Sequence, residues 1–201
     1  MALVIYGSPR SRTMRTLWAA AELDLAYEHV PLEWNDPGLK TPAFLTLNPA
    51  GSIPTIVDDG VAVAESMAIN LYLAKKYARP SNALYPKSPD AEAQVWRWSL
   101  WAQAHLEPWV QHDAAMGELR ASAGDAMSEL AAQGLNALDR TLGGRAWLVG
   151  ERFTIADLNV AGVLSPSRAA RLDLTPYAHV RGWLDACYSR PAALAVRARF
   201  S

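Results

Sequence analysis

Hydrophobic positions follow two different periods along the chain. In the first third, short apolar runs are broken by proline and glycine; alternation every two residues predicts strands there, and spacings of three and four predict helices. The expected elements are a strand over 2–6, a helix over 14–25, a strand over 27–32, a short helix over 42–47, a hairpin over 55–63 and a helix over 65–77. Their order is βαβ followed by ββα.

The rest of the chain has helical spacing throughout. Helices are expected over 89–119, 125–142, 154–164 and 177–189, with a short helical tail after Pro191. Pro108 lies inside the first of these and should kink it, because proline removes one backbone donor. Thr154 and Asp157 match a capping box ahead of an apolar run, which is a folding feature.

Three prolines within residues 80–89 separate the two parts. Such a stretch breaks any helix and is typical of a linker, and six of the eight tryptophans follow it. We therefore expect an α/β domain over 1–79, a linker over 80–89 and an all-helical domain over 90–201.

Composition narrows the function classes. With 51% hydrophobic residues, one cysteine and a net charge of −1, the chain is unlike disordered chains and disulfide-rich secreted domains. Its balanced charge gives no broad footprint for nucleic acid or an anionic membrane, no apolar run is long enough to span a bilayer, and the four dispersed histidines indicate no metal site. The expectation is a cytoplasmic protein without a metal.

The loop over 7–13 joins the first strand to the first helix. Exposed N–H groups and the positive end of the helix dipole are expected there, and both favour an anion such as a thiolate or carboxylate. Hydroxyls at Ser8, Ser11 and Thr13 could donate to a bound thiolate. Ser11 could equally be an ordinary helix cap, so the loop alone does not decide.

Two further segments carry candidate chemistry. A cis bond at Ile53–Pro54 would turn the Ile53 backbone outward to bond an extended peptide ligand, whereas a trans bond would make this an ordinary loop. Glu65–Ser66 begins a helix after the hairpin and could hold the amine and carboxylate of an amino acid. An ordinary capped helix start is the alternative there.

In this order and spacing, the motifs resemble those of cytosolic glutathione transferases. The resemblance covers essentially the whole chain and rests on Ser11 with Arg15, 48–54, 65–73 and 153–157. It implies a thioredoxin-like N-terminal domain that binds glutathione, an all-helical C-terminal domain that helps to bind the second substrate, and a homodimer.

The resemblance also implies individual roles. Ser11 matches the hydroxyl that activates glutathione in the serine-type, theta-like and zeta-like classes, where it donates a hydrogen bond to the thiolate. Ile53–Pro54 matches the pair whose backbone meets the cysteinyl part of glutathione, and Glu65–Ser66 matches the holders of its γ-glutamyl end. Tyr6 lies near the catalytic position of the tyrosine classes and is a rival donor.

Some residues depart from the family pattern. Ser52 stands where many relatives have a basic or amide residue that holds glutathione, so another group such as Lys40 would have to serve. The first loop has no cysteine, which argues against the thiol–disulfide reductase branch. It also lacks the Ser-Ser-Cys sequence of the zeta type, which weakens a maleylacetoacetate isomerase assignment.

The second substrate would meet the long tryptophan-rich helix. Trp98, Trp101, His105 and His112 lie at offsets 0, 3, 7 and 14, which places them on roughly one face of an α-helix. Such a stripe is either core or the wall of a cleft, and a cleft of aromatic rings would favour a flat, apolar electrophile.

The implied function is a glutathione S-transferase that conjugates glutathione to a small apolar electrophile. Isomerisation, dehalogenation and peroxide reduction would use the same thiolate. A non-catalytic binding or assembly module with the same fold is the alternative from another class, because a fold does not fix a function.

Overall fold

The computed structural model describes residues 3–110, 117–169 and 172–200, which form two compact units. The α/β unit comprises Met1–Pro86 together with Arg190–Ser201, and the helical unit comprises Lys87–Ser189. The division differs from the expected domains, because the sequence assigned all of 90–201 to the second domain whereas the last helix groups with the first.

The α/β unit contains the expected elements in the expected order. They are β1 (Leu3–Tyr6), α1 (Thr13–Glu22), β2 (Tyr27–Val30), the 3-10 helix η1 (Pro37–Lys40), α2 (Pro42–Leu47), β3 (Thr55–Asp58), β4 (Val61–Ala64), α3 (Ser66–Tyr77) and α10 (Pro191–Phe200). Only η1 was not expected from the sequence. It begins behind Asp36, whose carboxylate accepts a hydrogen bond from the Gly38 N–H, and has Pro37 at its first position, a common start for a helix.

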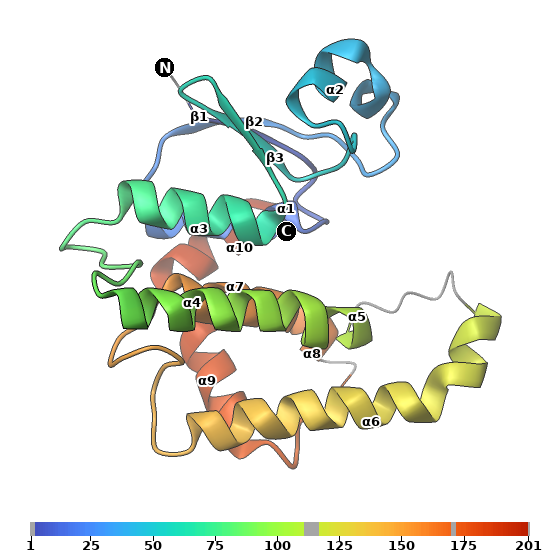
Figure 1. The fold of residues 1–201 in the computed structure, drawn as a ribbon, viewed down its shortest axis with the longest axis vertical. Coiled ribbons are helices and arrows are strands. Elements are labelled where there is room, and N and C mark those ends of the chain that lie inside the picture. The colour runs from blue at the N-terminus through green and yellow to red at the C-terminus, as the bar shows by residue number, and fades with distance from the viewer. Residues whose placement is uncertain (1–2, 111–116, 170–171, 201) are drawn as a thin grey trace. The chain divides into compact units, whose positions relative to one another are not determined.

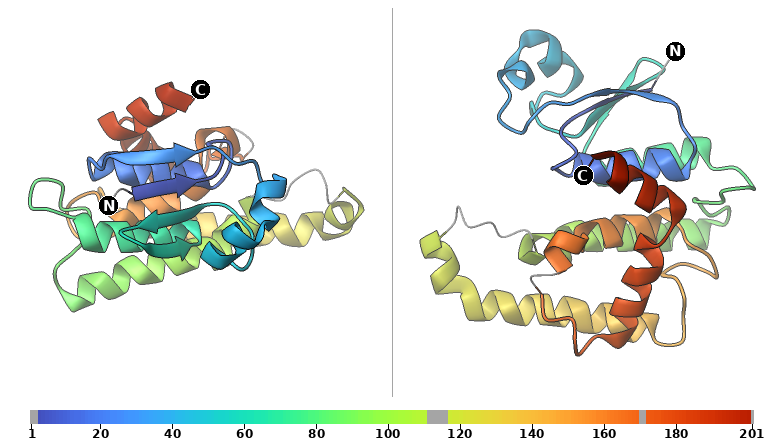
Figure 2. Two further views of the ribbon diagram at one scale, coloured as in Figure 1. Left: turned by 90° about the horizontal axis from the view of Figure 1, so that it is seen from above. Right: turned by 180° about the vertical axis from the view of Figure 1, so that it is seen from behind.

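The four strands form one mixed sheet in the order β2-β1-β3-β4. The β1–β2 pair is parallel and the other two are antiparallel. Helices α1, α3 and α10 lie on one side of the sheet, and α2 lies away from that layer (Figures 1 and 2). Ile5 and Ile56 of the sheet and Leu17 and Leu73 of the helices are fully buried in this thioredoxin-like core.

An ion pair joins α10, the last helix, to α1. Nε and Nη2 of Arg190 each donate to one carboxylate oxygen of Glu22, both at 2.7 Å, the bidentate geometry that makes arginine–carboxylate pairs strong. Ala193 and Val196 of α10 are buried. The C-terminal segment is therefore an integral layer of the α/β unit.

The helical unit is built around one buried helix. Its elements are α4 (Pro89–Trp101), the π-helix η2 (Ala102–Leu106), α5 (Glu107–Val110), α6 (Gly117–Leu142), α7 (Ile155–Val163), α8 (Pro166–Ala169) and α9 (Ala178–Tyr188). Every residue of α7 is buried, and α7 packs against both α4 and α9. In Figure 1, α7 runs alongside α4.

The predicted capping box at the start of α7 is confirmed. Asp157 accepts hydrogen bonds from the Thr154 N–H at 2.9 Å and the Thr154 hydroxyl at 3.2 Å. It also accepts from the Leu148 N–H and from Nε1 of Trp183, both at 2.9 Å. One buried carboxylate thus joins the α7 cap to a loop and to α9.

The helix expected over 89–119 is interrupted before Pro108. An α-helix would need a hydrogen bond from residue 108 to the carbonyl of residue 104, which proline cannot donate and whose oxygen its ring would crowd. The backbone instead takes the wider π turn over Ala102–Leu106. Residues 111–116, within the expected helix, lie outside the described residues.

Within the described ranges, no helix is long and apolar enough to cross a membrane. The same ranges contain no group of three or more histidine, cysteine, aspartate or glutamate side chains that could hold a metal ion.

Candidate functional site

Strand register brings the three candidate segments to one end of the sheet. Tyr6 pairs with Thr55, and Thr55 pairs with Ala64. The end of β1, the start of β3 and the end of β4 therefore lie side by side. The residues that continue from these three positions are the loop over 7–13, Ile53–Pro54 and Glu65–Ser66.

Gly7 shows how closely the first two segments approach. It has φ +134°, and a Cβ added to it would overlap the Thr13 hydroxyl and lie 3.0 Å from Cβ of Ile53. Only glycine adopts this backbone conformation without strain. The loop can thus lie directly against the Ile53–Pro54 pair because position 7 lacks a side chain.

Ser11 is held in a local network of hydrogen bonds. Its hydroxyl donates to the Ser8 carbonyl oxygen at 2.7 Å, accepts from the Thr13 N–H at 3.1 Å and lies 2.9 Å from the Thr13 hydroxyl. Thr13 is fully buried, whereas Ser11 is only half-buried. The Ser11 hydroxyl is therefore held in position by the loop, and the residue that carries it is partly exposed to solvent.

The start of α1 corrects one expectation. The sequence predicted exposed N–H groups there, but the loop uses several of them itself: Thr13 donates to the Ser11 hydroxyl, Met14 to the Ser11 carbonyl and Arg15 to the Arg12 carbonyl. The helix dipole still favours an anion at this end. The Ser11 hydroxyl also has a partner within the loop, the Ser8 carbonyl oxygen at 2.7 Å, so a bound anion would compete with bonds that the loop already makes.

The Ile53–Pro54 bond is cis. Asn48, which is buried, supports the preceding loop by donating to the Ser52 carbonyl at 2.9 Å, the Ser52 hydroxyl at 3.2 Å and the Thr55 hydroxyl at 3.0 Å. Asn48 begins the segment 48–54 of the family resemblance, but the sequence did not predict this bracing role. An asparagine just before proline and glycine was the available signal, since its side chain readily bonds nearby backbone groups.

Lys40, the last residue of η1, contacts the same loop. Its Nζ donates to the carbonyl oxygens of Ala50 at 3.2 Å and Gly51 at 3.0 Å. Gly51 has φ +57°, and a Cβ there would meet the Leu39 carbonyl oxygen at 2.7 Å. Lys40 thus braces the loop that carries Ser52, and its ammonium group adds positive charge beside that residue.

Glu65 stands in an unusual backbone conformation. Its φ of 69° and ψ of 116° put an exposed, non-glycine residue in a region that side chains rarely occupy, at a cost of order 1–3 kcal/mol. Ser66, which follows, is buried at the first position of α3. First-turn N–H groups have no partner within their own helix, so a carboxylate, a hydroxyl and backbone donors meet here.

Tyr6, the rival donor, lies at the end of β1. It is half-buried, and its ring meets Phe44 of α2 edge-to-face with a centroid distance of 5.7 Å. Alternation along β1 buries Leu3 and Ile5 on the helical side of the sheet, so Tyr6 projects from the opposite face.

His29 is a contact that sequence reasoning missed. Its Nε2 donates to the Gly7 carbonyl oxygen at 2.8 Å, and the Gly7 N–H donates to the Val30 carbonyl at 2.9 Å. β2 therefore fixes the point at which the Ser11 loop leaves the sheet. Alternation marked the face of β2 on which His29 lies, but nothing in the sequence identified its acceptor.

The candidates for the second substrate lie in the helical unit and differ in exposure. Trp98 is buried, Trp101 is half-buried and packs edge-to-face on Trp98 at 5.1 Å, and His105 is exposed. The π turn over Ala102–Leu106 changes the angular phase between Trp101 and His105, so the single α-helical stripe does not continue through it. His112 lies outside the described residues.

Comparison with known proteins agrees with this architecture. Residues 1–75 match the glutathione S-transferase N-terminal domain, and residues 98–191 match the glutathione S-transferase C-terminal domain. Glutathione S-transferase 3 of Zea mays is 33% identical, with 94% of this chain and 90% of the relative covered.

Solved structures agree over the whole chain as well. A glutathione S-transferase from Pseudomonas fluorescens superposes with a TM-score of 0.82 at 26% identity, covering 96% of this chain and 97% of the other. Ure2p in complex with glutathione has a TM-score of 0.86 at 20% identity, with 97% of both chains covered, which is a likeness of fold. Together, the two domain matches and the Zea mays relative establish that the chain belongs to the glutathione S-transferase family.

Proposed function

We propose that this chain binds glutathione, favours ionisation of its thiol and conjugates it to a small apolar electrophile. The observation that carries the proposal is the meeting of the Ser11 loop, the cis Ile53–Pro54 pair and Glu65–Ser66 at one end of the sheet. Family membership supports the transferase class, and two structures of Ure2p, which shares the fold, hold glutathione and S-p-nitrobenzylglutathione respectively.

Each segment suits one part of glutathione. In this proposal the backbone of Ile53 offers peptide hydrogen bonds to the cysteinyl residue. Glu65 pairs with the amine of the γ-glutamyl end, while the Ser66 hydroxyl and the first-turn N–H groups of α3 receive its carboxylate. Lys40 supplies positive charge beside Ser52 for the remaining carboxylate.

Ser11 is the proposed donor to the thiolate. A free thiol has a pKa of about 8.5, and a hydrogen bond to the thiolate together with a helix N-terminus lowers that pKa. The single hydrogen of the Ser11 hydroxyl, which bonds the Ser8 carbonyl at 2.7 Å, turns toward the sulfur at a cost of about 1 kcal/mol for the lost bond. The Thr13 hydroxyl can then donate to the Ser11 oxygen.

The chemistry is a nucleophilic substitution. The thiolate forms a carbon–sulfur bond with an electrophilic carbon, the bond to the leaving group breaks with its electron pair, and the thiol proton has already passed to solvent.

Aromatic side chains of the helical unit, Trp101 among them, suit an apolar second substrate. The family resemblance also supports a homodimer in the cytoplasm.

The test compares Ser11→Ala with Tyr6→Phe. With an activated chlorodinitrobenzene as electrophile, we expect Ser11→Ala to lower glutathione-dependent turnover about tenfold or more, the scale of losing one donor to developing charge, and Tyr6→Phe to leave turnover within twofold of wild type. A loss confined to Tyr6→Phe would transfer the role to Tyr6. Full turnover in both variants would overturn the assignment of a hydroxyl donor.

Calorimetric titration of reduced glutathione into the wild-type protein, at neutral and mildly alkaline pH, tests the binding step separately. Saturable binding with proton release supports the transferase proposal, because the thiol then ionises in the site. Binding without turnover of any electrophile would favour a glutathione-dependent module instead. Absence of binding at millimolar ligand would overturn the proposal.

A further inference from the structure

The loop over 7–13 leaves the sheet at Gly7, and β2 holds both polar backbone groups of this residue. The Gly7 N–H donates to the Val30 carbonyl oxygen at 2.9 Å, and the Gly7 carbonyl oxygen accepts from Nε2 of His29 at 2.8 Å. A carbonyl oxygen can only accept, so the hydrogen of the second bond is carried by Nε2. The His29 side chain is therefore part of what sets the start of the loop.

The position of Gly7 is passed on to Ser11 through Thr13. A Cβ added to Gly7 would overlap the Thr13 hydroxyl, so the two residues are in close contact. The Thr13 hydroxyl oxygen lies 2.9 Å from that of Ser11, and the Thr13 N–H donates to the Ser11 hydroxyl at 3.1 Å. Because Thr13 is fully buried, a displacement of Gly7 has to displace Thr13 and with it the Ser11 hydroxyl.

His29 is itself held by α10. It pairs with Ile5 of β1, and partners in register place their side chains on the same face of a sheet. Ile5 is fully buried on the helical side, so His29 faces the helices. Its ring meets the ring of Phe200, the half-buried last residue of α10, edge-to-face with a centroid distance of 5.3 Å and an interplanar angle of 77°. This is a favoured geometry for two aromatic rings.

A second contact seats the same turn of α10 on β2. The Arg199 guanidinium lies 5.7 Å from the centroid of the Tyr27 ring and 5.2 Å from that of Phe200, within the range of cation–π attraction. Tyr27 is two residues before His29, so both side chains lie on the same face of the strand. The last turn of α10 thus packs along β2, which is an edge strand of the sheet.

We propose that His29 is a positioning residue for Ser11, and that Phe200 of α10 keeps the His29 ring in place. The inference rests on the proposed function, in which Ser11 donates to the glutathione thiolate. Without the bond from His29, Gly7 and Thr13 can shift, and the Ser11 hydroxyl is less often aligned with the sulfur. The last turn of α10 therefore influences how readily bound glutathione ionises.

The test measures the thiol pKa of bound glutathione, from the ultraviolet absorbance of the thiolate, together with kcat and KM for glutathione. His29→Leu should raise that pKa and lower kcat about fivefold, the scale of one hydrogen bond. KM for glutathione should stay within twofold, because Ile53 and Glu65–Ser66 are unchanged. His29→Gln keeps a side-chain N–H that can reach the Gly7 carbonyl and should restore both quantities, whereas Phe200→Leu should give a smaller change in the same direction as His29→Leu.

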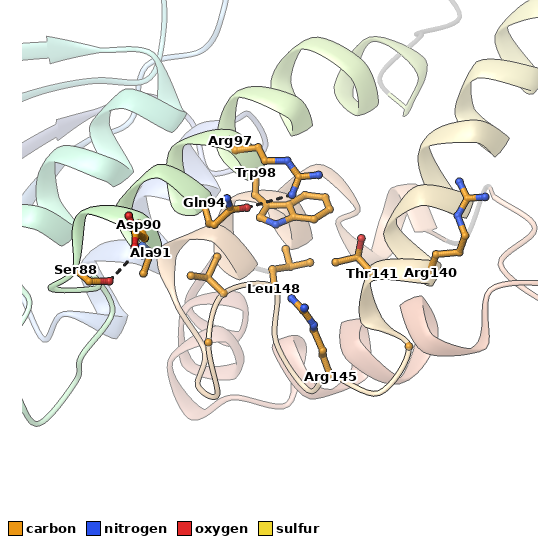
Figure 3. A pocket seen from close by; sticks show the side chains of 13 residues that line it. Ser88, Asp90, Ala91, Gln94, Arg97, Trp98, Arg140, Thr141, Arg145 and Leu148 are labelled. Carbon is orange, nitrogen blue, oxygen red and sulfur yellow. Dashed lines mark hydrogen bonds between the residues drawn. The ribbon is translucent and has the colours of Figure 1, made fainter.

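The thiol pKa separates positioning from a general loss of stability. It is measured for bound glutathione only, so a variant that is merely less stable yields less active protein with an unchanged thiol pKa. Thr141→Val is the control for the loss of one side-chain hydrogen bond. Thr141 lies on α6 in the wall of a pocket of the helical unit (Figure 3), and its hydroxyl donates to the Ala137 carbonyl at 2.8 Å. Its thiol pKa and kcat should equal those of wild type.

The outcomes distinguish this inference from the proposed function. Wild-type ionisation and turnover in His29→Leu, with both changed in Ser11→Ala, would overturn the role of His29 and leave the function of Ser11 intact. No change in either variant would overturn the proposed donor and this inference with it. Failure of His29→Gln to restore ionisation would refute the hydrogen bond as the cause, and wild-type behaviour of Phe200→Leu would refute the part assigned to α10.

Discussion

Glu65 combines an unfavourable backbone conformation with a position at the proposed site. Its exposed side chain does not cap α3, and only its carbonyl takes part in the helix, accepting from the Ile69 N–H at 2.8 Å. No capping hydrogen bond from the Glu65 side chain therefore offsets the backbone cost, which is of order 1–3 kcal/mol. Retaining a carboxylate here makes physical sense when that carboxylate has a ligand to hold.

Replacing Glu65 with glycine should separate the two effects. Glu65→Gly relieves the positive φ, so the free energy of unfolding should stay level or rise by up to about 1 kcal/mol, after the entropy that glycine loses on folding. The affinity for glutathione should fall about tenfold, because a charge-assisted bond to the amine is lost. Chemical denaturation and calorimetric titration measure the two quantities.

Glu65→Gln is the companion variant. It keeps the strained backbone and the side-chain length, and removes only the charge. If glutathione binds the glycine variant as tightly as wild type, Glu65 has no part in recognition and its conformation needs another explanation.

At the residue scale, the sequence indicates local structure best. Turn and cap residues depend on their neighbours in the chain, and this is why Ser11, Ile53–Pro54 and Glu65–Ser66 could be selected as candidates; the structure brings their segments to one end of the sheet, and their roles stay predictions. The contact from His29 to Gly7 was missed because it joins residues 22 positions apart, and only the pairing of two strands brings them together.

At the scale of elements, Asp58 ties the β3–β4 hairpin to α3. It is almost fully buried and accepts from the Tyr72 hydroxyl at 2.9 Å, from Nζ of Lys76 at 2.7 Å and from the Tyr77 hydroxyl at 2.7 Å. Burial alone would raise the pKa of Asp58, but these three donors outweigh it and the pKa is lowered below 3.8. The ionised form is therefore favoured by folding.

The lowered pKa sets the direction of a pH effect. Because its pKa is lower in the folded protein, Asp58 takes up a proton at a higher pH in the unfolded chain than in the folded one. The contribution of Asp58 to the free energy of unfolding is therefore complete above about pH 5. That contribution is lost as the pH falls through the folded pKa. Asp58→Asn should lower the melting temperature near neutral pH by several degrees, and the gap to wild type should narrow as pH falls toward 3.

Asp59→Asn is the control for that experiment, because Asp59 is exposed and also bonds Lys76, at 3.0 Å. A surface ion pair contributes little, so its melting temperature should stay near that of wild type. A gap between Asp58→Asn and wild type that is constant from neutral to acid pH would refute the link to ionisation.

Elements were predicted well where hydrophobic period and turn chemistry agree. The hairpin at Asp59–Gly60, α2 and the capping box of α7 all follow from such local signals. The π turn of η2 was not predicted, since Pro108 indicates a break in helical bonding but does not specify how the backbone will absorb it.

For the whole molecule, the main finding is that the α/β unit is made from two separate stretches of chain. Periodicity predicted a tail helix after Pro191 but gave no information on its neighbours. Arg190 and Glu22 are 168 positions apart, and nothing local to either residue identifies the other. The division at the proline-rich stretch was visible in the sequence, whereas the return of α10 to α1 was not.

Removing α10 should therefore weaken the α/β unit. A chain that ends at Ser189 loses the pair between Arg190 and Glu22 and uncovers the face of α1 that Ala193 and Val196 bury, at a cost of about 2–4 kcal/mol. Hydrogen exchange read by peptide should show faster exchange in α1 than in α7, which belongs to the helical unit.

Arg190→Gln provides a milder version that keeps α10 in place. It should raise exchange in α10 and α1 while changing α6 and α9 little. Equal acceleration in both units would contradict the assignment of α10 to the α/β unit alone.

The return of α10 also sets an order of events during synthesis. A ribosome makes the chain from its first residue, so the strands and the site-bearing loops of the α/β unit emerge early, while their last packing layer emerges only after the whole of Lys87–Ser189. Until α10 has been synthesised, the outer face of α1 stays uncovered and Glu22 cannot form its ion pair with Arg190. The unit that is first to emerge is thus last to be completed, and a nascent chain stalled before Arg190 should expose that face to chaperones.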